Sequence, residues 1–162
     1  MSRFIFTFVI LFAVWLGFTT SLNPQELIVG AVLSLLITLF AFKTFTDYGL
    51  SFFHPKKLFN IIKFIFVFLI ALIKSNFDVA RRVINPKLPI NPGIVTYKTQ
   101  LKSDTAKVFL ANAITLTPGT LTVDIIGDEL FIHWIDVISR KPEVIFNEIG
   151  ADFERILKEI FE

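Results

Sequence analysis

The feature that most restricts the fold is the crowding of apolar residues into three runs within the first half of the chain, at residues 4–19, 26–42 and 58–76. Over the whole chain 54% of the 162 residues are hydrophobic and only 19% are charged, whereas soluble domains carry about 25% charged residues. The runs approach the roughly 20 apolar residues that span a bilayer. The sequence therefore predicts a membrane protein with two to three transmembrane helices.

The first two runs predict a helical hairpin, because Asn23-Pro24 lies between them and proline favours the first turn of a helix. Cleavage as a signal peptide is not expected, since the first run lacks a good small-residue cleavage site and a second run follows at once. Small residues four apart, Ala13 with Gly17 and Gly30 with Ser34, predict a groove for close helix packing. The alternative is that such spacings arise by chance in any apolar helix.

The third run has a helical pattern that continues to residue 84 and carries ionisable residues near one face. They are Lys63, Lys74, Asp78 and Arg81. One interpretation is a third membrane helix whose two lysines reach opposite interfaces. The other is an amphipathic helix lying in the cytoplasmic interface. A polar, turn-prone loop is expected before it, at 44–57.

Charge and hydropathy favour different answers for this third run. Three crossings place Lys56 and Lys57 outside, against the tendency of cations to stay in the cytoplasm, and two crossings place them inside. Leaving residues 61–73 half wet costs about 25 cal/mol for each Å² of apolar surface. On this second ground we expect three crossings with the N-terminus outside.

The second half of the chain predicts a small cytoplasmic α+β domain at 94–162, joined to the membrane part (1–84) by a proline-rich linker at 85–93. Its expected order is β-α-β-β-α, with helices on one face of the sheet. The elements are a strand at 94–102, a helix at 105–114, strands at 121–126 and 129–137 separated by a Gly127-Asp128 turn, and a helix from Pro142.

The apolar positions of the two helices predict which faces pack on the sheet. In the first helix the core residues are expected to be Val108, Phe109 and Ala113. In the second, residues spaced three or four apart form a stripe: Ile145, Ile149, Phe153, Ile156 and Ile160.

Between the first helix and the second strand, residues 111–124 combine alternating threonines with Pro118-Gly119. Proline fixes one φ near −65° and glycine permits a positive φ at the next residue, so the backbone must bend sharply. Small polar groups on a fixed bend suit recognition of shape. We expect a subunit-docking motif made of Asn112, Thr115, Thr117, Pro118, Gly119 and Thr120.

Catalytic, metal and cofactor sites are not expected. The two histidines, His54 and His133, have no partners at metal-ligand spacing, and the chain has no cysteine. A base formed by His133 with Asp124 or Asp136 is less favoured than an ordinary histidine in a strand. A net charge of +2 without basic clusters argues against nucleic acid.

The segment Asn112-Ala113-Ile114-Thr115-Leu116-Thr117-Pro118-Gly119-Thr120-Leu121 closely resembles the "N-x-ITLTPGT" signature of the E subunit of multisubunit cation/proton antiporters of the Mrp, Mnh or Pha type. Two further segments agree. Residues 74–79 resemble that family's "K-x-N-x-D-V" segment, and His133-Trp134-Ile135 resembles its strand "[IV]-H-x-[IL]". The resemblance covers nearly the whole chain.

The resemblance implies an inner-membrane complex of several different subunits that exports Na⁺ or K⁺ in exchange for H⁺. Proton translocation belongs to the large subunits, so this chain is expected to be a multi-pass, non-catalytic accessory or assembly subunit that contacts other subunits and the bilayer. Consistent with that role, Glu26 is the only acidic residue between Phe4 and Phe42. The alternative is a stand-alone membrane-anchored regulatory or ligand-binding module.

Overall fold

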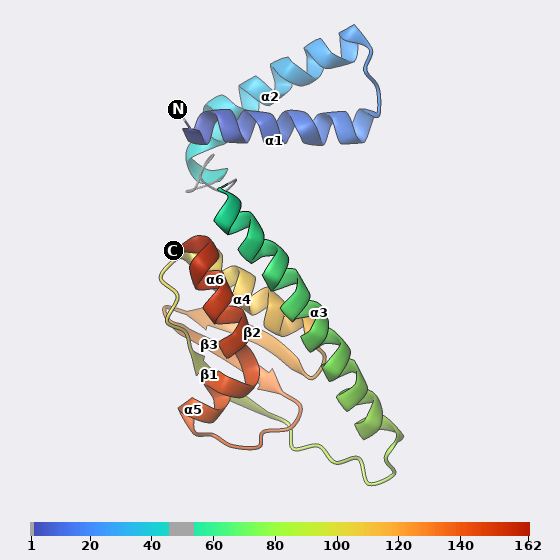
Figure 1. The fold of residues 1–162 in the computed structure, drawn as a ribbon, viewed down its shortest axis with the longest axis vertical. Helices are drawn as coiled ribbons and strands as arrows, with labels where there is room; N and C mark the ends of the chain where they lie inside the picture. Colours follow the sequence, from blue (N-terminus) through green and yellow to red (C-terminus); the bar gives the residue numbers. More distant parts are fainter. Residues whose placement is uncertain (1, 46–53) are drawn as a thin grey trace. The chain divides into compact units, whose positions relative to one another are not determined.

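A computed structural model describes residues 2–45 and 54–162, which form two compact units, 1–58 and 59–162. All three apolar runs are helical: α1 (Ser2–Thr19), α2 (Pro24–Phe45) and α3 (Pro55–Ile84) (Figure 1). By length and hydropathy, α3 and the segment Pro24–Phe42 of α2 are each able to cross a membrane, while the apolar part of α1 is shorter. The loop expected at 44–57 falls mostly on residues 46–53, outside the described part.

The first unit is an antiparallel hairpin of α1 and α2. The Phe4 and Phe42 rings meet at 5.8 Å near one end, and Trp15 Nε1 donates to the Glu26 carbonyl at 3.0 Å near the other. Its buried positions among the described residues are small, namely Thr7, Gly30, Ser34 and Thr38. Large apolar side chains point outward instead, as expected where the surrounding medium is lipid.

The second unit contains α3 and an α+β domain whose elements follow the predicted β-α-β-β-α order. They are β1 (Gly93–Lys98), α4 (Asp104–Leu116), β2 (Thr120–Ile126), β3 (Glu129–Trp134), and a helical C-terminal segment made of α5 (Pro142–Ile145), a π-helical turn (Phe146–Gly150) and α6 (Ala151–Phe161). The strands form an antiparallel sheet in the order β1-β3-β2, with a register shift between Thr122 and Asp124 of β2.

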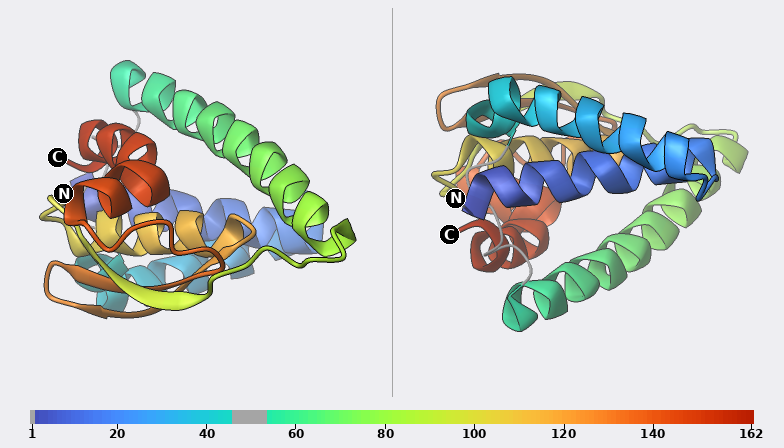
Figure 2. Two further views of the ribbon diagram at one scale, coloured as in Figure 1. Left: turned by 90° about the horizontal axis from the view of Figure 1, so that it is seen from below. Right: turned by 90° about the horizontal axis from the view of Figure 1, so that it is seen from above.

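One face of this sheet is covered by the helices, as predicted (Figure 2). Side chains that alternate along β1 and β3 build the covered face, with Val95, Tyr97, Leu130 and Ile132 each at most 3% exposed. Side chains of the intervening positions lie on the other face, where Ile94 is 54% exposed. The fold is therefore a two-layer α+β domain attached to membrane helices.

The predicted core face of α4 is partly wrong. Val108 and Phe109 are 50% and 47% exposed, whereas Leu110 and Ile114 are buried together with the correctly predicted Ala113. The apolar positions of this helix fall on two neighbouring stripes, and the sheet takes the one that includes Leu110 and Ile114. Phe109 lies at the edge of the core.

The C-terminal segment begins at Pro142, and all five residues of its predicted apolar stripe are buried. The helix is not continuous, however, because a π-helical turn at Phe146–Gly150 interrupts it. At Gly150 a Cβ atom would lie 2.9 Å from the Tyr97 hydroxyl oxygen, so only glycine allows the helix to approach the Tyr97 ring this closely. Apolar periodicity alone does not reveal such a turn.

The linker is fixed to the domain at Asn91. Its backbone N–H donates to the Ile135 carbonyl at 3.1 Å, and its carbonyl accepts from the Val137 N–H at 2.9 Å. The Asn91 side chain also donates to the Val137 carbonyl at 2.8 Å. These bonds position the chain that connects α3 to β1.

Candidate partner-docking site

The Pro118-Gly119 bend adopts the predicted backbone conformation. Gly119 has a φ of +95°, which side-chain-bearing residues rarely adopt. Its carbonyl accepts a hydrogen bond from the Ile135 N–H at 2.8 Å. A Cβ atom at Gly119 would lie 3.1 Å from Ile135 Cγ2 and 3.6 Å from Val79 Cγ2 of α3. The bend is therefore held between the sheet and α3.

The threonines beside the bend complete the C-terminal end of α4. Thr117 Oγ1 donates to the Ala113 carbonyl at 2.8 Å, and Thr120 Oγ1 donates to the Ile114 carbonyl at 2.7 Å. The last carbonyls of a helix have no partners within the helix itself. These hydroxyls supply such partners, so they serve the fold directly.

A second pair of hydrogen bonds joins α4 to β2. The Thr122 N–H donates to Thr115 Oγ1 at 3.1 Å, and Thr122 Oγ1 donates to the Ala111 carbonyl at 3.1 Å. Asn112, by contrast, is exposed beside a cavity of about 400 Å³ between α4 and β2. Of the six predicted docking residues, Asn112 and Thr115 are exposed, while residues 117–120 are half-buried and several of their polar groups are hydrogen-bonded within the domain.

A cavity of about 330 Å³, which we call the bend cavity, opens between the bend and α3. Its lining combines polar groups from α3, the bend, the segment that follows β3, and the π-helical turn of the C-terminal segment. These residues include Ser75, Asp78, Arg82, residues 117–120, Asp136 and Glu148.

Arg82 organises the charged wall of the bend cavity. Its guanidinium donates to Asp78 Oδ2 at 2.7 Å, to Asp136 Oδ2 at 2.7 Å and to the Pro89 carbonyl at 2.8 Å. One side chain thus connects α3, the linker and the segment after β3. The helical pattern of the third apolar run pointed instead to the neighbouring Arg81 as an interfacial charge, and Arg81 is exposed. The i, i+4 spacing of Asp78 and Arg82 was the available signal.

The other residues of α3 that were predicted to be interfacial charges also lie at the surface. Lys63, Lys74 and Asp78 are all exposed, and Asp78 is the one paired with Arg82. Their role at a membrane interface remains a prediction.

The small residues predicted to form a packing groove lie differently on the two helices of the hairpin. Gly30 and Ser34 are buried, and a Cβ atom at Gly30 would overlap the Trp15 indole. Ala13 and Gly17 are exposed, and a Cβ atom at Gly17 would meet nothing within 4 Å. The physical reason is that the large Trp15 indole of α1 packs on Gly30, so only α2 needs a small residue at the contact.

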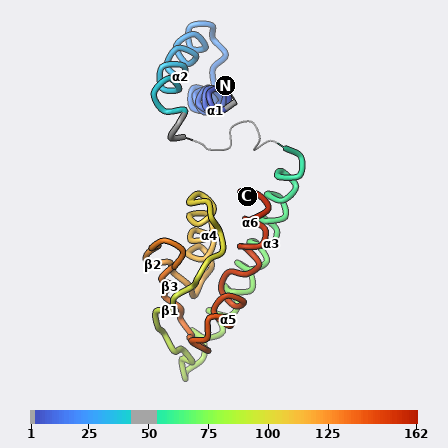
Figure 3. Tube along the Cα trace, turned by 90° about the vertical axis from the view of Figure 1, so that its left-hand side faces the viewer, coloured from blue at the N-terminus to red at the C-terminus, as the bar shows by residue number. Residues whose placement is uncertain are grey.

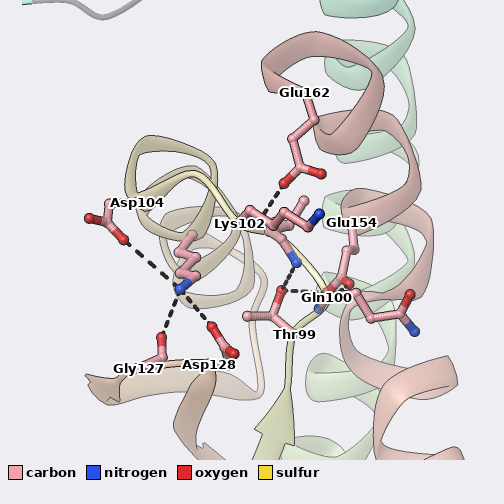
Figure 4. Close-up of polar contacts among 10 residues, drawn as sticks. Thr99, Gln100, Lys102, Asp104, Gly127, Asp128, Glu154 and Glu162 are labelled. Carbon is pink, nitrogen blue, oxygen red and sulfur yellow. Dashed lines mark hydrogen bonds and ion pairs between the residues drawn. The ribbon is translucent and has the colours of Figure 1, made fainter.

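Glu154 of α6 is a buried carboxylate that the local sequence pattern does not reveal, and it is 3% exposed (Figure 4). It accepts hydrogen bonds from the Tyr97 hydroxyl at 2.8 Å, the Thr99 hydroxyl at 2.8 Å and the Gln100 N–H at 2.7 Å. Burial, together with the charge of Glu154, raises the pKa of the Tyr97 phenol above its ordinary value. This cluster fastens α6 to the end of β1.

A second polar cluster holds the β2–β3 turn. Lys107 of α4 is buried, and its Nζ donates to Asp128 Oδ1 at 2.8 Å and to the Gly127 carbonyl at 3.0 Å (Figure 4). The hydrogen bond with Asp128 raises the pKa of Lys107 and lowers the pKa of Asp128. Gly127 itself has a φ of +62°, as a tight turn requires.

The structure does not assemble the suggested base around His133. This histidine is exposed, Asp136 binds Arg82, and the Asp124 carboxylate accepts from the Ile125 N–H at 2.8 Å. Within residues 2–45 and 54–162, no three His, Asp or Glu side chains are grouped as metal ligands would be. The polar groups described above hold elements together.

Comparison with known proteins places these features in a wider group. The family described as "Na+/H+ ion antiporter subunit" matches residues 8–160. The "Na(+)/H(+) antiporter subunit E1" proteins of Staphylococcus aureus strains bovine RF122 / ET3-1 and JH9 are each 35% identical over 150 residues, covering 91% of both chains. A chain in the structure of the membrane-bound sulfane sulfur reductase, an archaeal respiratory membrane complex, is 49% identical, with a TM-score of 0.84 over 99% of this chain and 100% of that one.

Proposed function

The chain belongs to the Na⁺/H⁺ antiporter subunit family, and from this membership we propose that it is a non-catalytic accessory subunit of a cation/proton antiporter complex that exports Na⁺ or K⁺ in exchange for H⁺. The observation that carries the proposal is the extent of the match, which covers residues 8–160 and so includes both the membrane hairpin and the α+β domain.

The distribution of ionisable residues supports a non-catalytic role. An ion path through a bilayer needs charged or titratable groups in the membrane interior, where they are expensive to place. The described residues buried between α1 and α2 are threonine, glycine and serine, and Glu26 lies next to the turn of the hairpin. Ion translocation then belongs to other subunits, and this chain contributes to their assembly.

The hairpin and the domain have different places in this proposal. The hairpin anchors the chain in the cell membrane, since its outward side chains are large and apolar. The domain at 94–162 faces the cytoplasm, because Arg81, Arg82 and Lys87, which lie just before it in the chain, are then on the inner side. The linker at 85–93 joins α3 to the domain.

We place the subunit contact at the Pro118-Gly119 bend and the exposed Asn112. Their support is geometric, because the bend is fixed by Ile135 and by the capped end of α4, so it presents an invariant shape without ordering cost on binding.

A second candidate is a subunit of a membrane respiratory complex. It is favoured by the 49% identity with a chain of the sulfane sulfur reductase complex, which exceeds the 35% identity with the antiporter subunits. Both candidates make the chain one subunit of a membrane complex, and they differ in the partners present.

Purification through a C-terminal affinity tag, combined with deletion of the chain, distinguishes the candidates. The antiporter proposal predicts that other antiporter subunits co-purify and that deletion abolishes Na⁺- or K⁺-dependent proton exchange in membrane vesicles. Co-purification with redox subunits, and loss of sulfane sulfur reduction on deletion, would establish the second candidate. A chain that purifies alone and leaves both activities unchanged on deletion would be the stand-alone module, contradicting both.

A further inference from the structure

Helix α3 runs beside the α+β domain, as Figures 1 and 3 both show. Contacts at three levels mark the line where they meet. These are Phe64 and Phe68 with Phe153 at ring distances of 6.0 and 6.3 Å, Val79 with Gly119, and Arg82 with Asp136 at 2.7 Å. From residue 64 to residue 82 an α-helix rises about 27 Å. The domain therefore accompanies α3 over most of its length, including the apolar run that was expected to cross the bilayer.

This arrangement conflicts with a crossing at 58–76. A cavity of about 570 Å³ between α3 and the C-terminal helix is lined by Val67 and Lys74 on one side and by Glu148 and Asp152 on the other. Both carboxylates belong to exposed residues. If α3 crossed the hydrocarbon while keeping its contacts with Phe153, these charges would enter the membrane too, and charged groups there are strongly disfavoured.

The opposite side of α3 is a continuous apolar surface, which we call the lipid face. Its members recur three or four residues apart and are 45–74% exposed: Phe59, Ile62, Phe66, Leu69, Ile73 and Phe77. An exposed apolar surface of this length is unusual on a soluble domain and indicates contact with a membrane or a partner. The lipid face points away from the stripe that meets the domain, because the two sets lie about half a turn apart on the helix.

A row of cations borders the lipid face. Lys56, Lys63, Lys74 and Arg81 are exposed and follow one another at intervals of 7, 11 and 7 residues. At 100° per residue these intervals return to within about 20° of the same direction. This cation stripe lies about a quarter turn from the centre of the lipid face. Apolar residues flanked by cations are typical of a helix lying in the interface of an anionic membrane.

We propose that α3 does not cross the bilayer but lies in the membrane interface, on the side where the α+β domain is. Its lipid face meets the acyl chains, the cation stripe meets anionic headgroups, and the domain is held against the surface. This replaces the three-crossing expectation with two crossings by α1 and α2. Arg3 and the cations of α3 then share the inner side, in keeping with the positive-inside tendency.

The charge pattern selects lipid over a partner helix as the occupant. A membrane-embedded partner would have to place an acidic side chain opposite each of the four cations, which is costly within a bilayer, whereas the headgroups of an anionic bilayer supply negative charge along the whole stripe.

Depth measurement on the assembled complex tests the inference. The natural chain has no cysteine, so a spin label can be attached at one position in Phe66→Cys and at another in Phe77→Cys, with Glu159→Cys as an aqueous control. Collision with oxygen and with a water-soluble nickel complex gives the depth of each label in vesicles that contain anionic lipid. An interfacial α3 places labels 66 and 77 at the same shallow depth, since both belong to the lipid face.

A crossing helix would instead separate the two labels in depth by about 16 Å, because they are 11 residues apart. That result, or labels shielded from both oxygen and nickel by a partner subunit, would overturn the proposal. Replacing Lys63, Lys74 and Arg81 together with Gln should make both labels shallower, and the change should disappear in vesicles made only of zwitterionic lipid.

The sidedness of α3 gives an independent measurement. With His54→Cys and Lys158→Cys in separate complexes, a membrane-impermeant maleimide should label both positions from the same side of sealed vesicles. Labelling from opposite sides would mean that α3 crosses.

Discussion

The hairpin and the α+β domain bury opposite kinds of residue. In the hairpin Thr7, Ser34 and Thr38 are at most 3% exposed, while Phe18 and Phe40 are 86% and 88% exposed. In the domain apolar side chains such as Leu110 and Ile132 are fully buried. The difference shows that the two units are stabilised in different ways. In lipid, the helices of the hairpin associate through close packing of small residues, whereas in water the hydrophobic effect drives apolar side chains into the core of the domain.

Helix α3 combines both situations in one element. Its stripe toward the domain packs by ring contacts and an ion pair, and its lipid face repeats the outward apolar pattern of the hairpin. A single helix can therefore have one face adapted to lipid and the opposite face adapted to packing against a water-soluble domain.

The largest effect on stability is expected at Glu154, a charged residue buried in a domain whose interior is otherwise mostly apolar. Glu154→Leu leaves the Tyr97 hydroxyl, the Thr99 hydroxyl and the Gln100 N–H without their acceptor, and each unsatisfied buried donor costs about 1–3 kcal/mol. We expect the free energy of unfolding of the domain to fall by about 3–5 kcal/mol. Urea unfolding of the purified chain measures it, followed by the fluorescence of Trp134 in a Trp15→Phe background, because Trp15 of the hairpin is the other tryptophan of the chain.

The matched control is Glu159→Leu on the exposed side of α6, which should change the free energy of unfolding by less than about 0.5 kcal/mol. Equal, small effects of the two substitutions would mean that the three hydrogen bonds do not stabilise the domain.

A smaller effect is expected at the bend. Gly119→Val combines a disfavoured positive φ with close approach to Ile135 and Val79, whereas Gly127→Val has the positive φ but open space around it. The first should therefore cost at least about 1 kcal/mol more than the second. Gly119→Val should also reduce the amount of the chain that co-purifies with its complex.

If Gly119→Val were fully recovered in the purified complex and were as stable as Gly127→Val, the result would contradict both the tight packing at the bend and its role in docking.

How much of this could be read from the sequence depends on the range of each interaction. The helices, the strands, the positive φ of Gly119 and the burial of Ile145 through Ile160 follow from patterns within a few residues of one another. Glu154 was hidden because its hydrogen-bond partners lie 54 to 57 residues away, and Arg82 because Asp136 is 54 residues away.

Helix α3 was ambiguous for a different reason. Apolar residues occupy both its lipid face and its stripe toward the domain, so the count of apolar residues matches a membrane-spanning helix. The threonines of the bend were read as free for a partner because their acceptors, the end carbonyls of α4, become apparent only once the chain is folded.

In the hairpin the expected effect is on helix contact, because small residues define it. Gly30→Leu should force α1 and α2 apart, since even a Cβ atom would overlap Trp15, while Gly17→Leu should be tolerated. The cost of such overpacking is about 1–3 kcal/mol. The rate of disulfide formation between cysteines placed at Phe4 and Phe42, whose rings are in contact near one end of the hairpin, reports how often the two helices approach each other there.

Gly30→Leu should slow this disulfide formation in membranes, and Gly17→Leu should leave it unchanged. The reverse order would show that Ala13 and Gly17, as first expected from the sequence, make the helix contact.

The smallest effect on stability is expected at the Lys107–Asp128 pair, because the Asp128 side chain is largely exposed to water. The pKa of Asp128 is lowered in the folded state by its hydrogen bond to Lys107, so the pair stabilises the domain above the ordinary aspartate pKa. That contribution is lost as the pH falls through the lowered pKa. Asp128→Asn removes the titrating group, so the stability difference between the natural chain and the variant should be constant near pH 6 and shrink below about pH 4. Urea midpoints of both chains across this pH range measure the difference in stability. If that difference grew toward acid pH, charged Asp128 would have to destabilise the domain. That outcome would contradict its 2.8 Å contact with the buried Lys107 ammonium group.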